Sequence, residues 1–540
     1  MKKKIVLLIC TVLFCNMLGA CGGSRFTGGW SGGISRGNSS TNNSIEESMS
    51  VTMDSAIPDG IYYNTEMTRE HALEYNTEEY NHIVRNDFKS VATSPLSTFA
   101  MDIDTGSYPM LRKMVDEGRS AWEIPKGAIR TEEILNYFTF DFDNRVERDM
   151  FNVEYEIAEC PWDKDNLVVA VTLNSKDISL EKQPQRNFVI LFDTSGSMDD
   201  ADKGFLALHS CSTLIDNLNE EDKISIVTYA GSSELILDGS SNIKEIDKAL
   251  EEVMRHLEQG GGTNGSGGIT AAYEVAKDNF IPGGNNRVII FSDGDMNLGI
   301  TDQTGLIELV EGYAKDENIF LTTLGFGTGN YSDANMEQIA NKGNGSYYYI
   351  DCLSEGRRVL RDRLNQSTQT VAKDAKIQVE FNPLYVSEYR LLGYENRAMA
   401  DEDFADDTKD GGEVGPNQSV TVLYEIKPTS GEVKGSNLKY QEAPELSEEA
   451  LVSTEILTLS VRYKEPEGDK STLEEFPVIY DATLEPSEDF YFACGIASLV
   501  DSIMNEDNLD DAYRLLKDGN TSNVEERKEL ITIVDYLRDN

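Results

Sequence analysis

Two kinds of hydrophobic pattern divide the chain beyond residue 90. Between Asn187 and about Ser367, short apolar runs alternate with amphipathic segments of helical period, which predicts a mainly parallel sheet covered by helices on both faces. The expected strands are 188–192, 224–229, 288–291, 320–325 and 347–350, and the expected helices are 203–217, 243–258, 266–279, 303–315, 333–341 and 355–366. A short turn before Ser232 predicts that one hairpin interrupts this alternation.

The stretches on either side alternate apolar and polar residues, as half-buried antiparallel strands do. The expected strands are 96–103, 151–158 and 167–173 before the α/β stretch, and 375–381, 386–393, 420–426, 456–463 and 475–480 after it. Helices are expected at 110–117, 130–137, 490–505, 510–517 and 524–537. We expect strands from the two sides to pair with each other, so that the α/β domain is an insertion in a β-sandwich.

The first residues have the pattern of a targeting segment. Lys2, Lys3 and Lys4 precede an apolar run, 5–17, that is too short to span a bilayer. The run Leu18-Gly19-Ala20-Cys21 resembles the lipobox of bacterial lipoproteins, which implies cleavage before Cys21 and lipidation of its thiol. An ordinary secretory signal is the alternative. Residues 22–60 are rich in Gly, Ser, Asn and Thr, which predicts a flexible tether.

Composition excludes some classes of partner. The 540 residues carry a formal net charge of −47, which argues against binding to nucleic acid or to an anionic membrane surface. The cysteines beyond the targeting segment are scattered without metal-ligand spacing, and their disulfide pairing stays open. They are Cys160, Cys211, Cys352 and Cys494, of which Cys211 falls in an amphipathic helix and is expected to be buried.

Five oxygen-bearing side chains carry the candidate chemistry. Asp193, Ser195 and Ser197 follow one buried strand, Thr263 follows three glycines, and Asp293 follows another strand. Open α/β sheets place ligands at the carboxyl ends of their parallel strands. Carboxylates and hydroxyls without His or Cys suit Mg²⁺, with Mn²⁺ or Ca²⁺ as alternatives. Two carboxylates give the cation little anionic ligation, so we expect a Glu or Asp of a protein partner to complete its coordination.

The order of these motifs resembles the metal-ion-dependent adhesion site (MIDAS) of von Willebrand factor A domains, with all five ligand positions matched. The segments 95–108, 132–138 and 371–540 are similar to those of the bacterial YfbK-like lipoproteins. The resemblance implies an α/β, Rossmann-like, doubly wound A domain, flanked by a mainly β, sandwich-like region and a C-terminal helical segment. It implies the following divisions: signal peptide 1–20, tether 21–90, N-terminal region 91–185, A domain 186–368 and C-terminal domain 369–540.

The function implied is binding rather than catalysis. We expect an extracytoplasmic protein that touches the membrane through its lipid anchor alone, on the outer membrane of a diderm or the outer face of a monoderm's cytoplasmic membrane. It would bind an acidic residue of a protein partner through the cation, in adhesion or envelope assembly. The alternative is an envelope protein with a purely structural metal, and a hydrolase is the remote third class.

One motif suggests competing chemistry. Asp104-Thr105-Gly106-Ser107 spells the motif of pepsin-like aspartic proteases, which need two carboxylates that share a proton. The second candidate, at Asp193, has an inserted Ser, so no protease dyad is expected. Asp102 and Asp104 are expected to be solvated carboxylates at a strand end.

Overall fold

The computed structural model describes residues 80, 83–177, 184–294, 303–328, 333–364, 370–429, 447, 451–466, 468–481 and 485–540. The predicted signal peptide, Cys21 and most of the predicted tether lie outside these residues. Within the described ranges, no helix combines the length and the apolar character needed to cross a bilayer.

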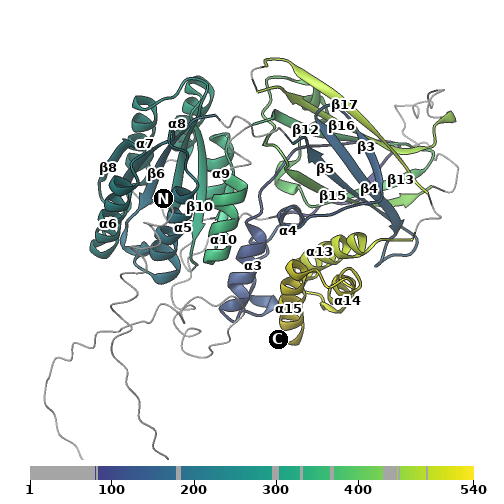
Figure 1. Cartoon of the computed structure of the whole chain (residues 1–540). Coiled ribbons are helices and arrows are strands. Elements are labelled where there is room, and N and C mark those ends of the chain that lie inside the picture. The colour runs from purple at the N-terminus through teal and green to yellow at the C-terminus, as the bar shows by residue number, and fades with distance from the viewer. Residues whose placement is uncertain are drawn as a thin grey trace, which may run out of the picture. The chain divides into compact units, whose positions relative to one another are not determined.

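The central stretch forms the predicted α/β sheet (Figure 1). Its strands run in the order β11-β10-β9-β6-β7-β8. Five of them are parallel, and β8 pairs antiparallel with β7, which confirms the predicted hairpin. The strands are β6 (Arg186–Asp193), β7 (Lys223–Tyr229), β8 (Ser233–Ser240), β9 (Asn285–Ser292), β10 (Phe320–Phe326) and β11 (Tyr347–Ile350).

Helices cover both faces of this sheet because successive side chains of a strand point to opposite sides. Phe188, Ile190 and Phe192 of β6 pack with one group of helices, and Val189 and Leu191 pack with the other. The first group is α5 (Leu206–Asp216), α6 (Ile243–Gln259) and the π-helical segment η5 (Arg358–Arg363), which follows α10 (Leu353–Arg357). The second group is α7 (Gly265–Asp278), α8 (Gln303–Glu317) and α9 (Asp333–Lys342).

The flanking stretches form two antiparallel sheets that share one hydrophobic core, as the predicted β-sandwich requires. One sheet has the order β1-β13-β15-β5-β4-β3, and the other has the order β14-β12-β16-β17 with β2 beside β12. These strands are β1 (Lys89–Ser90), β2 (Leu96–Ala100), β3 (Asn144–Glu147), β4 (Phe151–Glu159), β5 (Leu167–Ser175), β12 (Ala372–Phe381), β13 (Val386–Leu392), β14 (Gly412–Val414), β15 (Ser419–Pro428), β16 (Glu455–Lys464) and β17 (Ser471–Ile479).

Strands from before and after the α/β stretch pair directly. β5 pairs with β15, and β2 pairs with β12, each antiparallel. This pairing confirms that the α/β domain is inserted between the strands of a β-sandwich. It also joins the predicted regions 91–185 and 369–540 through shared sheets.

The position predicted for the end of the tether is wrong. The sequence predicts a tether through residue 90, but Lys89–Ser90 form strand β1, which pairs with Tyr389 and Glu388 of β13. Asn86 also donates from Nδ2 to the carbonyl oxygens of Leu391 and Gly393. The backbone at 86–90 is therefore fixed by hydrogen bonds of the sandwich, which polar composition alone does not reveal.

The remaining helices share a core with the edge of the α/β sheet. α3 (Ser107–Asp116) and α4 (Thr131–Tyr137) pack with α13 (Glu488–Asn505), α14 (Asp510–Asp518) and α15 (Glu525–Asp539). Tyr347 and Tyr349 of β11 are buried in the same cluster. Helix α3 thus lies between the C-terminal helices and the inserted domain (Figure 1).

Candidate metal centre

The predicted site lies at the carboxyl ends of two neighbouring parallel strands. Asp193 is the last residue of β6, and Asp293 directly follows β9, which pairs with β6. Both carboxylates are fully buried. Because parallel neighbours end at the same edge of a sheet, the strand order alone brings these two carboxylates together.

The first loop turns its side chains through a short 3-10 helix, Gly196–Met198. The Ser195 N–H donates to Oδ1 of Asp193 at 2.9 Å, and the hydroxyls of Ser195 and Ser197 lie 3.0 Å apart. Ser195 is buried and Ser197 is half-buried. The three predicted residues of this loop therefore form one cluster of oxygen donors.

The glycine loop lies against this cluster. The Gly196 N–H donates to the Gly261 carbonyl at 3.0 Å, and the Asn264 N–H donates to the Ala230 carbonyl at 2.6 Å. Gly260 has a φ of +60°, and a Cβ there would lie 3.3 Å from the Gly196 Cα. Glycine is needed for this close approach. The loop places the buried Thr263 two residues beyond the contact.

Asp193 has two further partners that the sequence analysis does not identify. The hydroxyls of Tyr229 and Ser292 each donate to its Oδ2 at 2.8 Å. Burial, and then the neighbouring charge of Asp293, raise the pKa of Asp193 to about 6. The hydrogen bonds orient the carboxylate, and the repulsion between the two acids favours a bound cation.

Lys203 is a third residue of the site that sequence reasoning misses, and it contacts Asp293. It lies in the π-helical segment η4 (Ala201–Phe205) that precedes α5, where the sequence predicts an ordinary helix from residue 203. Its Nζ donates to Oδ2 of Asp293 at 3.0 Å, and its side chain is buried. A lysine next to a run of acids and small residues gives no sequence signal for this contact.

The donor set fits a hard divalent cation. Carboxylate and hydroxyl oxygens are the ligands that Mg²⁺ and Mn²⁺ prefer. Among the described residues, no group of three or more His, Cys, Asp and Glu side chains forms a metal cluster.

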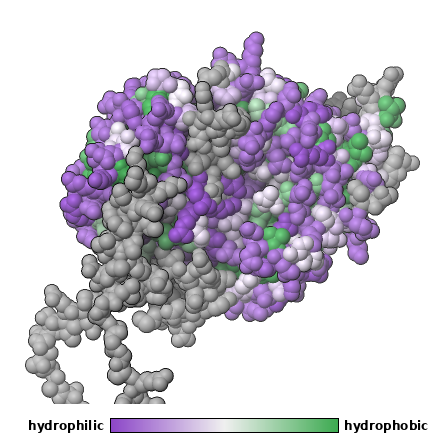
Figure 2. Space-filling model, in the orientation of Figure 1, coloured by the Kyte–Doolittle hydropathy of each residue, from purple (hydrophilic) through white to green (hydrophobic). Residues whose placement is uncertain are grey.

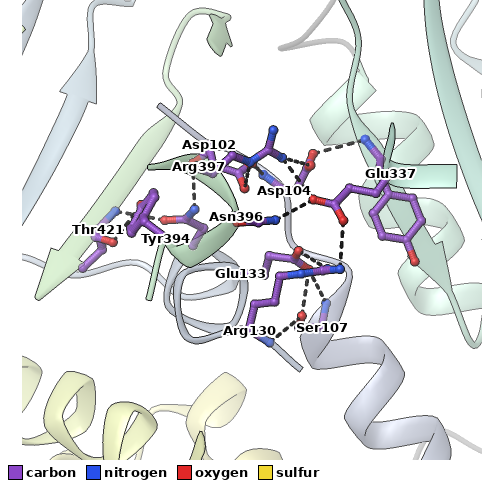
Figure 3. Close-up of polar contacts among 12 residues, drawn as sticks. Asp102, Asp104, Ser107, Arg130, Glu133, Glu337, Tyr394, Asn396, Arg397 and Thr421 are labelled. Atoms are coloured by element: carbon purple, nitrogen blue, oxygen red, sulfur yellow. Dashed lines mark hydrogen bonds and ion pairs between the residues drawn. The ribbon is translucent and has the colours of Figure 1, made fainter. Parts of the chain in front are cut away.

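The structure corrects the expectation for Asp102 and Asp104. Both are buried rather than solvated. Arg397 donates to Asp102 at 2.9 Å and to Asp104 at 3.1 Å, and the Tyr347 N–H donates to Asp104 at 3.1 Å (Figure 3). Asp104 and Asp193 thus have separate sets of partners, and the pair of carboxylates that an aspartic protease needs does not form.

Among the described residues, histidine and cysteine side chains take part in no metal-binding group of three or more His, Cys, Asp and Glu. His209 is exposed, and Nδ1 of His256 lies 3.0 Å from the Thr228 hydroxyl. Cys211 is buried, as expected, and Cys160, Cys211, Cys352 and Cys494 are free thiols.

Comparison with known proteins identifies the family. Residues 187–357 match the family described as von Willebrand factor type A domain, 366–539 match the family described as Uncharacterized protein YfbK, C-terminal, and 74–170 match one described as von Willebrand factor. The Uncharacterized protein YfbK of Escherichia coli (strain K12) is 37% identical over 438 residues, which cover 79% of this chain and 74% of that protein. The chain belongs to the YfbK family.

Solved structures similar to this YfbK-family chain include other A-domain proteins. The von Willebrand factor type A protein from Catenulispora acidiphila is 15% identical, with 72% of this chain and 91% of that one covered and a TM-score of 0.40. Proximal thread matrix protein 1 from the mussel byssus, solved with a zinc-occupied MIDAS motif, is 20% identical, with 35% and 48% covered and a TM-score of 0.29. The five site residues of the YfbK-family chain all fall within the segment that matches the A-domain family.

Proposed function

We propose that this YfbK-family chain is a lipid-anchored, extracytoplasmic binding protein whose A domain uses a divalent cation, Mg²⁺ in the first place, to bind an acidic residue of a protein partner. The observation that carries the proposal is the pair of buried carboxylates, Asp193 and Asp293, at adjacent strand ends beside a cluster of hydroxyls. Cys21 would carry the lipid.

Each site residue has a distinct role in this proposal. Asp193, Ser195, Ser197, Thr263 and Asp293 would hold the cation, and Tyr229 and Ser292 fix the orientation of the Asp193 carboxylate. A cation held mainly by neutral oxygens supplies an electrophilic, open position for an external carboxylate. The function that we propose for this site is therefore binding.

Recognition must act at short range. The chain carries a net charge of −47, and Figure 2 shows hydrophilic residues over most of the face in view. This field opposes the approach of an acidic partner, but physiological salt screens it beyond about 8 Å. The cation therefore captures one carboxylate at contact and does not attract a partner from a distance.

Asp193→Asn tests the bridging role. Asn keeps an oxygen that can accept from Tyr229 and Ser292, whereas Ala would remove the acceptor that these two buried hydroxyls share and change stability for that reason. We expect the variant to lose Mg²⁺-dependent capture of membrane proteins, compared with EDTA and read by mass spectrometry. Calorimetry should show that it has also lost Mg²⁺ binding.

The matched control is Asp278→Asn, an exposed aspartate at the far end of α7 from the glycine loop. This variant should keep both Mg²⁺ binding and Mg²⁺-dependent capture of membrane proteins. Capture that survives Asp193→Asn would contradict the bridging role. Loss of metal binding accompanied by loss of the folded state would instead favour the alternative, a structural metal.

A further inference from the structure

Lys203 occupies a constrained position beside the proposed metal site. Its ammonium contacts Asp293, and its methylene chain crosses Gly327, where a Cβ would lie only 2.4 Å from the Lys203 Cγ. Gly327 has a φ of +72°, and its carbonyl accepts from the Tyr349 hydroxyl at 2.9 Å. Two segments, η4 and the end of β10, thus fix where the ammonium lies.

Helix α3 of the flanking region holds both of these segments. Lys113 donates to Asp202, the residue before Lys203, at 2.8 Å. Glu117, which follows α3, accepts from the hydroxyl of Thr328, the residue after Gly327. Burial alone would raise the pKa of Asp202, but Lys113 more than offsets this and lowers it, so the Lys113–Asp202 pair is charged. π-Helical turns such as η4 are frequent at functional sites.

Helix α3 is itself fixed to other parts of the chain. Arg112 forms a bidentate pair with Asp351, at 2.6 and 2.7 Å, just beyond β11. It also contacts Glu529 of α15 at 2.9 Å. A change at the C-terminal helices can therefore reach the position of α3 through direct contacts.

A lysine ammonium and a divalent cation make opposing demands on Asp293. Both need the same carboxylate, and they repel each other at close range. The buried ammonium neutralises Asp293 when no metal is bound, and it must give up or share this contact when a cation binds.

We propose that Lys203 competes with the divalent cation for Asp293, and that helix α3 sets the strength of this competition by holding η4 and the Gly327 turn. This inference rests on the proposed metal function and deepens it. Release of α3 would raise the metal affinity of the site. By linkage, metal binding would loosen the contacts of α3 to the same extent.

The test compares three variants of the full chain by calorimetric titration with Mg²⁺ and Mn²⁺. Lys203→Met should bind the metal about tenfold more tightly, because a unit positive charge next to the cation is removed. Its metal-free form should melt at a lower temperature, since Asp293 loses the buried ion pair with Lys203. Lys113→Met and Glu117→Gln leave every proposed ligand in place, and each should tighten binding about fivefold.

The directions in which metal affinity changes in these variants distinguish this mechanism from a general electrostatic effect. Lys113→Met removes a positive charge and Glu117→Gln removes a negative one, so a simple field effect would shift the metal affinity in opposite directions. Release of Lys203 would instead raise the metal affinity in both variants. Lys277→Met, which breaks an exposed pair with Glu317 at 2.6 Å, should leave the affinity unchanged.

The outcomes distinguish this inference from the proposed function. Metal binding by the wild-type chain with unchanged affinity in Lys203→Met would overturn the competition and leave the metal site intact. Opposite shifts in Lys113→Met and Glu117→Gln would overturn the role of α3, even if Lys203→Met did not fold. Absence of Mg²⁺ and Mn²⁺ binding in the wild type and in all variants would overturn the proposed function itself.

Discussion

Replacing Arg397 with Met is expected to lower the free energy of unfolding by about 3 kcal/mol at pH 8, because the change leaves two buried carboxylates without their paired cation. Arg397 lies in a short 3-10 segment after β13, and its guanidinium contacts both Asp102 and Asp104. Without the guanidinium, the carboxylates of Asp102 and Asp104 remain buried and unpaired. This desolvation penalty is larger than the net contribution of the intact ion pairs.

The arrangement around Arg397 joins three parts of the chain (Figure 3). Glu337 of α9 lies 3.5 Å from Arg397 and accepts from Arg130 at 2.8 Å. Arg130 in turn pairs with Glu133 at 2.6 Å, whose other oxygen accepts from Ser107. Because Glu337 keeps Arg130 in the variant, the destabilisation should come mainly from Asp102 and Asp104.

The pH dependence gives a second readout for Arg397→Met. Burial, and then the charge of Asp102, raise the pKa of Asp104 well above its ordinary value even with the arginine present. Protonation of this carboxyl as the pH falls should therefore remove part of the cost. Urea unfolding of wild type and variant at pH 5 and pH 8 measures the difference.

Arg514→Met is the matched control, since Arg514 forms exposed pairs with Asp511 and Asp518. Exposed pairs of this kind contribute at most about 1 kcal/mol. If Arg397→Met destabilised the protein no more than this control at pH 8, the buried acids would not depend on the guanidinium.

The parts of the fold that sequence patterns predict are those whose signal is local. The apolar run 188–192 is long enough for a buried strand, so both β6 and the position of Asp193 at its end follow from it. The insertion also follows from pattern, because antiparallel alternation stops at the α/β stretch and resumes after it. Strand ends then account for four of the five proposed ligands, and the glycines account for Thr263.

The parts that patterns miss depend on distant partners. Asp102 has the pattern of a solvated residue at a strand end, and the cation that pairs with it in its buried position, Arg397, lies 295 positions later. Tyr229 ends an apolar run and cannot be told from a packing residue until its hydroxyl meets Asp193, 36 positions away. Lys203 belongs to the same class, since Asp293 and Gly327 together define its place.

Glu132→Gln is expected to stabilise the protein, increasingly as the pH rises. Glu132 of α4 is buried, its Oε2 has no hydrogen-bond partner, and a Cβ on Gly393 would lie 2.6 Å from that oxygen. Burial, and then the charges of Glu395, Glu133 and Asp102, raise the pKa of Glu132 from 4.5 to about 8. Gln keeps the shape of the side chain and carries no charge.

The direction in which stability changes with pH follows from proton binding. Between pH 4.5 and 8, Glu132 is protonated in the folded chain and ionised in the unfolded chain. The stabilisation from this proton is complete below pH 4.5 and is lost as the pH rises to 8, at up to about 1.4 kcal/mol per pH unit. Relative to wild type, Glu132→Gln should therefore gain about 3 kcal/mol between pH 5 and pH 8.

Urea unfolding at intervals of half a pH unit measures this gain, and Glu258→Gln on the exposed face of α6 is the control that should follow wild type. A constant difference between Glu132→Gln and wild type across the range would mean that Glu132 does not take up a proton on folding. Because Asp102 is one of the charges that raise the pKa of Glu132, a gain that changes in size in Arg397→Met would show that the two sites are coupled.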